Sequence, residues 1–150
     1  MKASIINEFG PPSVFEFTHD APVPQIAPDQ VLIKVHAASV NPIDYKTRNG
    51  SLRWILGRKF PKILGYDVAG VIHACGSEVK DWNIGDRVCA RLDDRYGGAY
   101  AEFAACGARV LARIPDEISD AMAAAIPLAG LTALQGLQDF KKVDSGHRVL

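Results

Sequence analysis

The stretch Gln30-Val31-Leu32-Ile33-Lys34-Val35-His36-Ala37 decides the fold, and it runs directly into a polar segment at residues 38–50. Its apolar residues alternate with Lys34 and His36, and this period of two predicts a half-buried β-strand. Similar short runs lie between turns rich in glycine and proline. They cover residues 3–7, 14–18, 63–74, 86–92, 99–106 and 110–114. About seven short strands at this spacing predict a small barrel or a sandwich.

The polar segment at residues 38–50, which follows the strand at residues 30–37, predicts a corner and then a short helix. Asn41 precedes Pro42, which disfavours helical geometry at Asn41, whereas Pro42 itself suits a first helical turn. Helical spacing would place Asn41 and Tyr45 on one face and Asp44 and Arg48 on another. Two interpretations remain open here. The segment is a functional site, or it is a capped surface helix with a solvated Asp44–Arg48 ion pair.

A basic stretch follows this helix. Between Tyr45 and Tyr66 there is no acidic residue, while lysines and arginines recur throughout. Such a patch would attract an anionic cofactor or substrate, although solvated charges on a long loop explain it equally well. Within it, residues 54–56 (Trp-Ile-Leu) either line a substrate pocket or anchor the loop to the core.

The run at residues 63–74 reads as a buried strand that carries two unexpected polar side chains. Tyr66 and Asp67 are the only ones between Lys62 and His73. A polar group inside a buried strand requires a hydrogen-bonding partner or a function. The glycines in the same run indicate bends or close approach of another backbone.

The composition changes after residue 118. Ser119 is a suitable N-cap for an alanine-rich helix at 120–126, which Pro127 ends or kinks. A leucine-rich helix then extends to residue 140, and residues 144–150 read as a turn and the first residues of a strand. We therefore expect a β-domain at 1–126 and, at 127–150, a linking helix and the first strand of a truncated second domain. The leucine stripe would expose apolar surface, which predicts self-association of the chain or dependence on a partner.

The composition excludes several classes of function. The 17 basic and 17 acidic residues cancel, so a nucleic-acid partner is not expected. No apolar run is long enough to cross a bilayer, and the start of the chain does not read as a signal peptide, so we expect no membrane partner and a cytoplasmic location. Cys75, Cys89 and Cys106 fit small buried residues in a reducing compartment, and only the His73–Cys75 pair comes near metal-ligand spacing.

Five segments, taken in order, resemble the zinc-independent branch of the medium-chain dehydrogenase/reductase superfamily, the quinone oxidoreductase and zeta-crystallin-like group. They are Ser39-Val40-Asn41-Pro42-Ile43-Asp44 with Lys46, Arg48 and Gly50; Pro61 with Leu64-Gly65-Tyr66-Asp67-Val68-Ala69-Gly70-Val71; Gly85-Asp86-Arg87-Val88; Gly97-Gly98-Ala99-Tyr100-Ala101-Glu102-Phe103; and Ala123-Ala124-Ala125-Ile126-Pro127-Leu128 with Leu131-Thr132-Ala133. The likeness extends over essentially the whole chain.

The resemblance implies a mainly β fold with C-terminal helices, namely a GroES-like β-barrel, a linking helix and the start of a truncated Rossmann domain. It implies a reductase that transfers hydride from NADPH, or sometimes NADH, to a quinone or an α,β-unsaturated carbonyl. We also expect a homo-oligomer, in line with the self-association that the leucine stripe predicts. By its likeness to the family, Asn41 is assigned beside the nicotinamide and substrate, and Tyr45 and Tyr66 are further catalytic candidates. Lys46 and Thr132 are candidates for binding the cofactor. The isolated chain lacks a pyrophosphate cradle and is expected to be inactive.

The resemblance also bears on zinc. The zinc alcohol dehydrogenase branch carries a cysteine where this sequence has Asn41 and a histidine where it has Tyr66, so no zinc is expected. Two other hypotheses stay open: a relative of the zinc-type alcohol dehydrogenases, and a binding module of GroES-like fold without catalysis.

Overall fold

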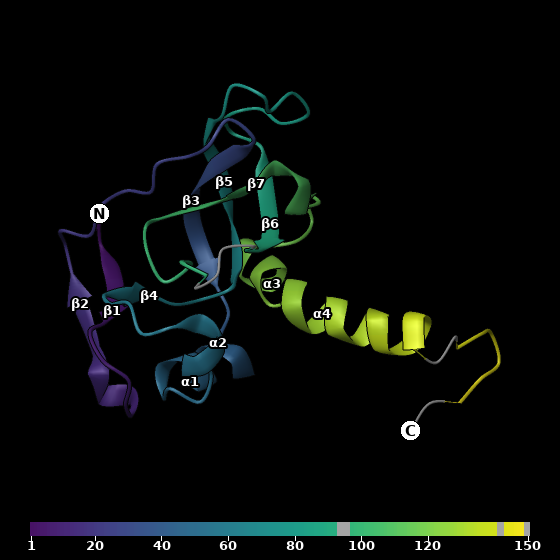
Figure 1. Ribbon diagram of the computed structural model, residues 1–150. Coiled ribbons are helices and arrows are strands. Elements are labelled where there is room, and N and C mark those ends of the chain that lie inside the picture. Colours follow the sequence, from purple (N-terminus) through teal and green to yellow (C-terminus); the bar gives the residue numbers. More distant parts are fainter. Residues whose placement is uncertain (93–96, 141–142, 149–150) are drawn as a thin grey trace.

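The computed structural model of the chain describes residues 1–92, 97–140 and 143–148. Its body consists of antiparallel strands, and its C-terminal helices extend away from that body (Figure 1). The strands are β1 (Ala3–Ile6), β2 (Phe15–Thr18), β3 (Gln30–Ala38), β4 (Lys62–Ile63), β5 (Asp67–Cys75), β6 (Arg87–Arg91), β7 (Phe103–Gly107) and β8 (Leu111–Arg113).

The larger sheet has the order β7-β3-β5-β6-β8 and holds the main core. The alternating side chains of β3 place Val31 and Ile33 in this core, together with Val68 and Ile72 from β5. All four are at most 1% exposed. The period of two in residues 30–37 therefore correctly predicted that Val31 and Ile33 of β3 are buried, and the apolar run at residues 63–74 correctly predicted a buried strand.

A smaller sheet has the order β2-β1-β4, and a single bridge between Ala3 and Ala101 connects it to the segment before β7. The mainly β fold with C-terminal helices that the resemblance implied is confirmed. The hydrogen-bonded strands of the described residues form two separate sheets, which do not close into a barrel. Contacts between backbone groups still tie the sheets together. The Ser4 amide, for example, donates to the carbonyl oxygen of Tyr100 at 2.8 Å.

The strand expected at residues 63–74 is divided into β4 and β5. Gly65 has a φ of +95°, a conformation that interrupts the extended backbone and that residues with a side chain rarely adopt. A methyl group at Gly65 would also collide with the ring of Tyr100. This break allows β4 to join the smaller sheet while β5 occupies the centre of the larger one.

The helix predicted after Asn41 is present as α1 (Pro42–Arg48), with Asn41 as its N-cap residue. A second, four-residue helix, α2 (Arg53–Leu56), lies in the stretch that we expected to be a loop. The α2 helix contains no buried residue, and Trp54 is 80% exposed. In this structure the tryptophan therefore does not anchor the segment to the core.

The C-terminal region contains α3 (Asp120–Ala124) and α4 (Pro127–Leu134), followed by a π-helical turn at Gln135–Phe140. Ser119 caps α3 as predicted, because its side chain accepts a hydrogen bond from the Met122 amide at 3.2 Å. The helix expected to reach residue 126 ends at Ala124, since Pro127 starts a new helix. Of the strand expected at the end of the chain, residues 149 and 150 lie outside the described part.

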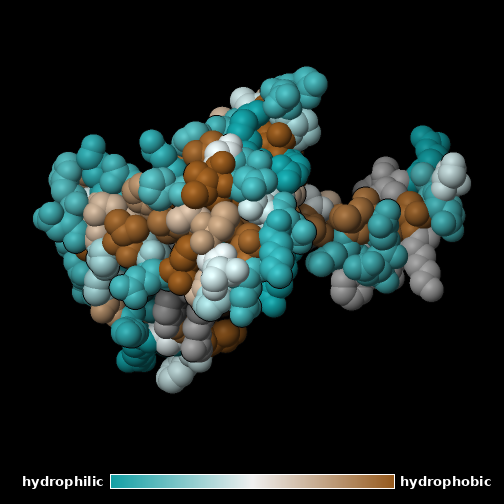
Figure 2. Space-filling view, turned by 90° about the horizontal axis from the view of Figure 1, so that it is seen from above, coloured by the Kyte–Doolittle hydropathy of each residue, from teal (hydrophilic) through white to brown (hydrophobic). Residues whose placement is uncertain are grey.

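The arm formed by α4 and the turn after it exposes apolar side chains. Leu131, Leu134 and Leu137 are 46%, 49% and 40% exposed, and Figure 2 shows apolar surface among the polar atoms of the projecting arm. The arm thus presents the apolar area that the leucine pattern predicted, uncovered by the rest of the described chain.

Helix α3 is held against the larger sheet by a charged cluster around Asp120. This carboxylate contacts Nδ1 of His36 from β3 at 2.7 Å and accepts a hydrogen bond from the Arg87 guanidinium of β6, also at 2.7 Å. Arg87 donates to the carbonyl oxygen of Ile118 as well, at 2.7 Å. His36, which the sequence placed on a solvent-facing side, therefore helps to position the helix.

A substitution at Gly70 tests how closely β3 and β5 pack against each other. A methyl group there would overlap the carbonyl oxygen of Lys34 on β3, a backbone atom that cannot move away cheaply. We expect Gly70→Ala to lower the free energy of unfolding by about 3 kcal/mol, at the upper end of overpacking costs. Gly136→Ala is the matched control, because a methyl group there meets no atom within 4 Å. Urea denaturation that shows equal stability for both variants would contradict this packing.

Asp120 predicts a pH-dependent contribution to stability. Hydrogen bonds from His36 and then Arg87 lower the pKa of this carboxyl below its ordinary value of 3.8. Because the folded pKa is depressed, the stabilisation is present above the unfolded pKa and is lost as pH falls through the folded pKa. We expect Asp120→Asn to cost about 1 kcal/mol at pH 7, since the cluster is partly exposed.

The difference between Asp120→Asn and the parent chain should shrink when chemical denaturation is repeated at progressively lower pH, below about pH 4. A stability difference that stays constant across this range would show that the charge of Asp120 is not what holds α3.

Candidate active site around Asp67

The buried carboxylate of Asp67 is the centre of the polar cluster at the start of β5. Asp67 is 0% exposed, and one of its oxygens, Oδ2, accepts hydrogen bonds from the Ser39 hydroxyl at 3.0 Å and the Asn41 amide at 2.9 Å. The backbone N–H of Leu128 donates to both carboxylate oxygens, at 3.1 and 3.2 Å. Three segments far apart in the sequence therefore meet at one carboxylate.

This arrangement compensates a buried charge in two ways. Direct donors replace the water that the carboxylate has lost, which a buried ionised group requires. Leu128 also lies in the first turn of α4, where the helix dipole favours a negative charge. The polar residue that looked out of place in a buried strand has its partners, and they come from other parts of the chain.

The Asn41 side chain is buried, at 8% exposure, and its Nδ2 group donates to both Ser39 Oγ, at 3.0 Å, and Asp67. Its two amide hydrogens are thus used within the protein. In this geometry Asn41 fixes the corner between β3 and α1. Its assignment beside a nicotinamide stays a prediction.

A second buried carboxylate, Asp44, supports the same corner. It accepts hydrogen bonds from the backbone N–H of Asn41 at 2.7 Å and of Gly65 at 3.0 Å. Burial raises the pKa of Asp44 above its ordinary value, although these hydrogen bonds oppose the shift. The expected ion pair with Arg48 is replaced, because Arg48 donates instead to the carbonyl oxygen of Gly10 at 3.2 Å.

The phenol of Tyr100 closes this corner from the segment before β7. It donates to the carbonyl oxygen of Ser39 at 3.2 Å, and burial, together with the neighbouring Asp44 carboxyl, raises its pKa. A phenol with a raised pKa keeps its proton, so Tyr100 acts here as a hydrogen-bond donor that positions the backbone.

The other candidate residues take different positions. Tyr66 is 2% exposed, directly precedes β5, and lies under the Arg91 guanidinium, 5.5 Å from the ring centre. Tyr45 and Lys46 are exposed on α1, and Tyr45 lines a cavity of about 80 Å³ with Asp44 and Tyr100. Thr132 is exposed on α4, where its hydroxyl donates to the Leu128 carbonyl oxygen at 2.7 Å.

The structure therefore brings some of the candidates together. Asn41 donates to Asp67, and Tyr66 directly precedes Asp67 in the chain. Thr132 lies one helical turn beyond Leu128, which also contacts Asp67. Tyr45 and Lys46 occupy the exposed side of α1. No contact in the described part of the chain links either of them to this carboxylate.

Sequence reasoning missed Ser39 and Tyr100 as members of this cluster. Tyr100 is distant in sequence from Asn41, and nothing in its local pattern indicates the contact. The backbone N–H of Leu128 could have been suspected, because Pro127 marks a helix start whose first donors lack partners within the helix. Among the described residues, no group of three or more His, Cys, Asp or Glu side chains could hold a metal ion.

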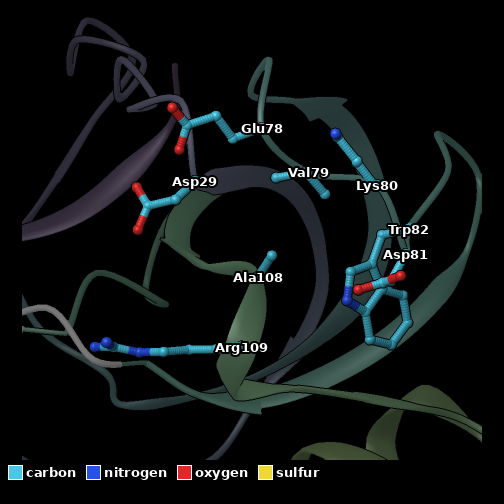
Figure 3. A pocket seen from close by; sticks show the side chains of 8 residues that line it. All are labelled: Asp29, Glu78, Val79, Lys80, Asp81, Trp82, Ala108 and Arg109. Carbon is cyan, nitrogen blue, oxygen red and sulfur yellow. The ribbon is translucent and has the colours of Figure 1, made fainter.

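A larger cavity, of about 250 Å³, lies at the opposite end of β5 (Figure 3). It is lined by Asp29, Glu78, Val79, Lys80, Asp81, Trp82, Ala108 and Arg109. Its charges are mixed in sign, and it contains none of the candidate residues. We therefore place the functional site at the Asp67 end of the sheet.

Comparison with known proteins identifies the family. The model of the alcohol dehydrogenase GroES-like domain matches residues 27–116. The chain belongs to this family. The match contains β3, α1, β5, β6 and β7, and hence the segments that contribute Ser39, Asn41 and Asp67 to the site.

Two relatives that are similar in sequence to this chain are, according to their names, oxidoreductases that act on quinones or alkenals. The chain is 44% identical over 129 residues to a chloroplastic quinone-oxidoreductase homolog of Spinacia oleracea, covering 84% of this chain and 39% of that protein. It is 41% identical over 143 residues to the chloroplastic NADPH-dependent alkenal/one oxidoreductase of Arabidopsis thaliana, covering 91% and 37%. The solved quinone oxidoreductase of Coxiella burnetii superposes with a TM-score of 0.87 at 40% identity, covering 97% and 46%.

These findings confirm the resemblance to the quinone oxidoreductase group of the medium-chain dehydrogenase/reductases. The chain spans less than half the length of the relatives that it matches. No helix in the described part of the chain is long and apolar enough to span a membrane.

Asp67→Asn tests the central carboxylate. The variant replaces a charged acceptor of several hydrogen bonds with a neutral one, so we expect a loss of about 2–3 kcal/mol in the free energy of unfolding and faster hydrogen exchange at the Leu128 amide. Asp81→Asn is the control, since it makes the same charge change at an exposed position. Similar unfolding and exchange for the two variants would show that Asp67 does not hold the site.

Proposed function

We propose that this chain is the N-terminal, catalytic part of an NADPH-dependent oxidoreductase that reduces quinones or α,β-unsaturated carbonyls by hydride transfer without zinc. The observation that carries the proposal is the buried Asn41 amide at the start of α1, held by the Asp67 carboxylate that also binds the first turn of α4. The relatives named as quinone oxidoreductases and as an alkenal/one oxidoreductase support the same reaction class.

The chemistry requires a fixed polar surface beside the reacting carbons. Bound NADPH would supply the hydride, which leaves negative charge on the substrate oxygen. Preorganised donors stabilise such a charge without the cost of reorganising water. Asn41 is fixed by hydrogen bonds on both sides, and the phenols of Tyr66 and Tyr45 are the candidate sources of a donor or a proton.

The residues present suit only one end of the cofactor. Asn41 offers an amide at the start of α1, Thr132 offers a hydroxyl one turn beyond Leu128 on α4, and Lys46 adds an exposed ammonium group on α1. These groups fit the amide and hydroxyls of the nicotinamide riboside. The pyrophosphate needs a glycine-rich turn at a helix start, which belongs to a Rossmann domain. The activity therefore requires more protein than these 150 residues.

The proposal of zinc independence rests on ligand chemistry. Asn41 and Tyr66 offer an amide and a phenol at the positions where the resemblance to the zinc branch places a thiolate and an imidazole. Zinc prefers sulfur and imidazole ligands, so an amide and a phenol are poor replacements.

We also propose that residues 1–126 form the catalytic domain and that residues 127–150 lead into the nucleotide-binding domain. The exposed leucines of α4 and the following turn supply apolar area for that domain or for a second subunit, which supports a homo-oligomer.

We propose a cytoplasmic location on the basis of composition. Fractionation of cells that express the protein, with the reductase found in an organelle, would contradict it.

The direct test uses the product of the complete reading frame. We expect it to oxidise NADPH when given quinones or enones, to do so after treatment with EDTA, and to contain no stoichiometric zinc by elemental analysis. Activity at background with both substrate classes would contradict the function. Activity that is lost with EDTA and restored by zinc would contradict the zinc-free mechanism alone.

Asn41→Ala tests the residue that carries the proposal. We expect kcat to fall by about one to two orders of magnitude, because a fixed polar group beside the reacting atoms is lost. Asn83→Ala removes the same side chain from an exposed turn and should leave kcat unchanged. Steady-state kinetics with equal kcat values for the two variants would remove Asn41 from the mechanism.

A further inference from the structure

Arg91 is an exposed cation at the edge of the Asp67 cluster. The proposed hydride transfer assigns no role to it. It is the last residue of β6, and in the β5–β6 ladder it lies directly opposite Asp67. Figure 1 shows this end of β6 beside α3 and the start of α4, and α4 contacts β6. The guanidinium therefore belongs to the same end of the sheet as Asn41 and Leu128.

The structure gives Arg91 no acidic partner within its described part. The ion pairs found there use His36, Arg87 and Arg113. Asp67 itself is satisfied by Ser39, Asn41 and Leu128, so it does not need Arg91 as a counterion. Within the described chain, the one hydrogen bond of the Arg91 guanidinium is a long contact of 3.4 Å to the Leu92 carbonyl oxygen.

The position of the guanidinium is nevertheless defined. It lies 5.5 Å from the centre of the Tyr66 ring, and Tyr66 is buried and thus fixed. The adjoining backbone is fixed as well, because the Leu92 amide donates to the Tyr66 carbonyl oxygen at 2.6 Å. The guanidinium is planar, and its fork of N–H donors suits the recognition of carboxylate-like groups through two parallel hydrogen bonds.

We propose that Arg91 recognises an anionic group, such as a carboxylate or sulfonate, on the quinone or enone substrate. This inference rests on the proposed function, and it narrows the substrate class to molecules whose conjugated carbonyl is joined to an acidic substituent. Neutral quinones lack the group that would pair with this cation. Arg91 is in this sense a specificity residue, whereas the hydride chemistry does not require it.

The test compares 1,4-naphthoquinone with 1,4-naphthoquinone-2-sulfonate, using the product of the complete reading frame. Because the two quinones differ in intrinsic reactivity, the informative quantity is the ratio of their kcat/KM values in each variant. We define the ratio as kcat/KM for the sulfonate divided by kcat/KM for the neutral quinone. Arg91→Gln should lower this ratio by about tenfold, which is the lower end of the range for the loss of a hydrogen bond to a charged group. Arg91→Lys should lower it less, and Arg109→Gln, at the opposite end of β5, should leave it unchanged.

A binding measurement without NADPH gives a readout that does not depend on turnover. Quenching of tryptophan fluorescence should show that Arg91→Gln weakens binding of the sulfonate about tenfold and removes most of its dependence on salt. Thermal melts that match the parent protein exclude misfolding, and Arg91→Lys serves as the second variant if Arg91→Gln does not fold.

Three outcomes separate the possibilities. Unchanged ratios and dissociation constants in Arg91→Gln would overturn the proposal while leaving the reductase function intact. An increase in KM for NADPH but not NADH, with the quinone ratio unchanged, would mean that Arg91 reads a cofactor phosphate, which also overturns it. If the parent enzyme reduces neither these quinones nor enones, the proposed function fails, and the binding titration alone then decides whether Arg91 recognises the anion.

Discussion

The hydrogen bonds of the buried Asp67 carboxylate are the constraint on which the rest of the site depends. A charge with no exposure to water is tolerated only if donors surround it, and here those donors come from the end of β3, the start of α1 and the start of α4. Each donor fixes the segment that carries it. The carboxylate therefore sets where α4 leaves the β-sheets, and the route of α4 away from the body follows from it (Figure 1).

A second carboxylate makes the corner rigid. Asp44 binds the backbone of Asn41 and of Gly65, so the loop before β5 and the start of α1 are tied to one another. Asp67 also contributes to the raised pKa of Asp44, although burial is the larger cause. Two acidic groups at one end of the sheet need many donors, and this demand explains why polar residues gather here while the centre of the sheet is apolar.

This network changes how Asn41 is understood. The residue types suggested an amide that donates to a substrate oxygen, whereas in the structure both amide hydrogens are directed to Ser39 and Asp67. Either the amide exchanges partners when ligands bind, or its contribution is to hold the corner in place. The two roles differ in whether the side chain touches the reacting atoms. Arg91, by contrast, makes one long guanidinium hydrogen bond, to the Leu92 carbonyl oxygen, among the residues that the structure describes.

The sequence by itself determined several local features, although not helix α2 or the break between β4 and β5. Alternation in residues 30–37 predicted the central strand, Asn41-Pro42 the corner and helix, and Ser119 the cap of α3, because each depends on neighbouring residues only. Ordered motifs likewise indicated the family that the comparison confirmed.

The sequence also marked Tyr66 and Asp67 as polar residues in need of partners, but it could not name those partners. Tertiary structure decided that Ser39, Asn41 and the Leu128 amide meet at Asp67, that Tyr100 closes the corner, and that the strands form two sheets. The hydrogen bonds of Leu128 to Asp67 and of Tyr100 to Ser39 each join residues 61 positions apart. All of these contacts depend on the register and packing of strands that no local pattern encodes.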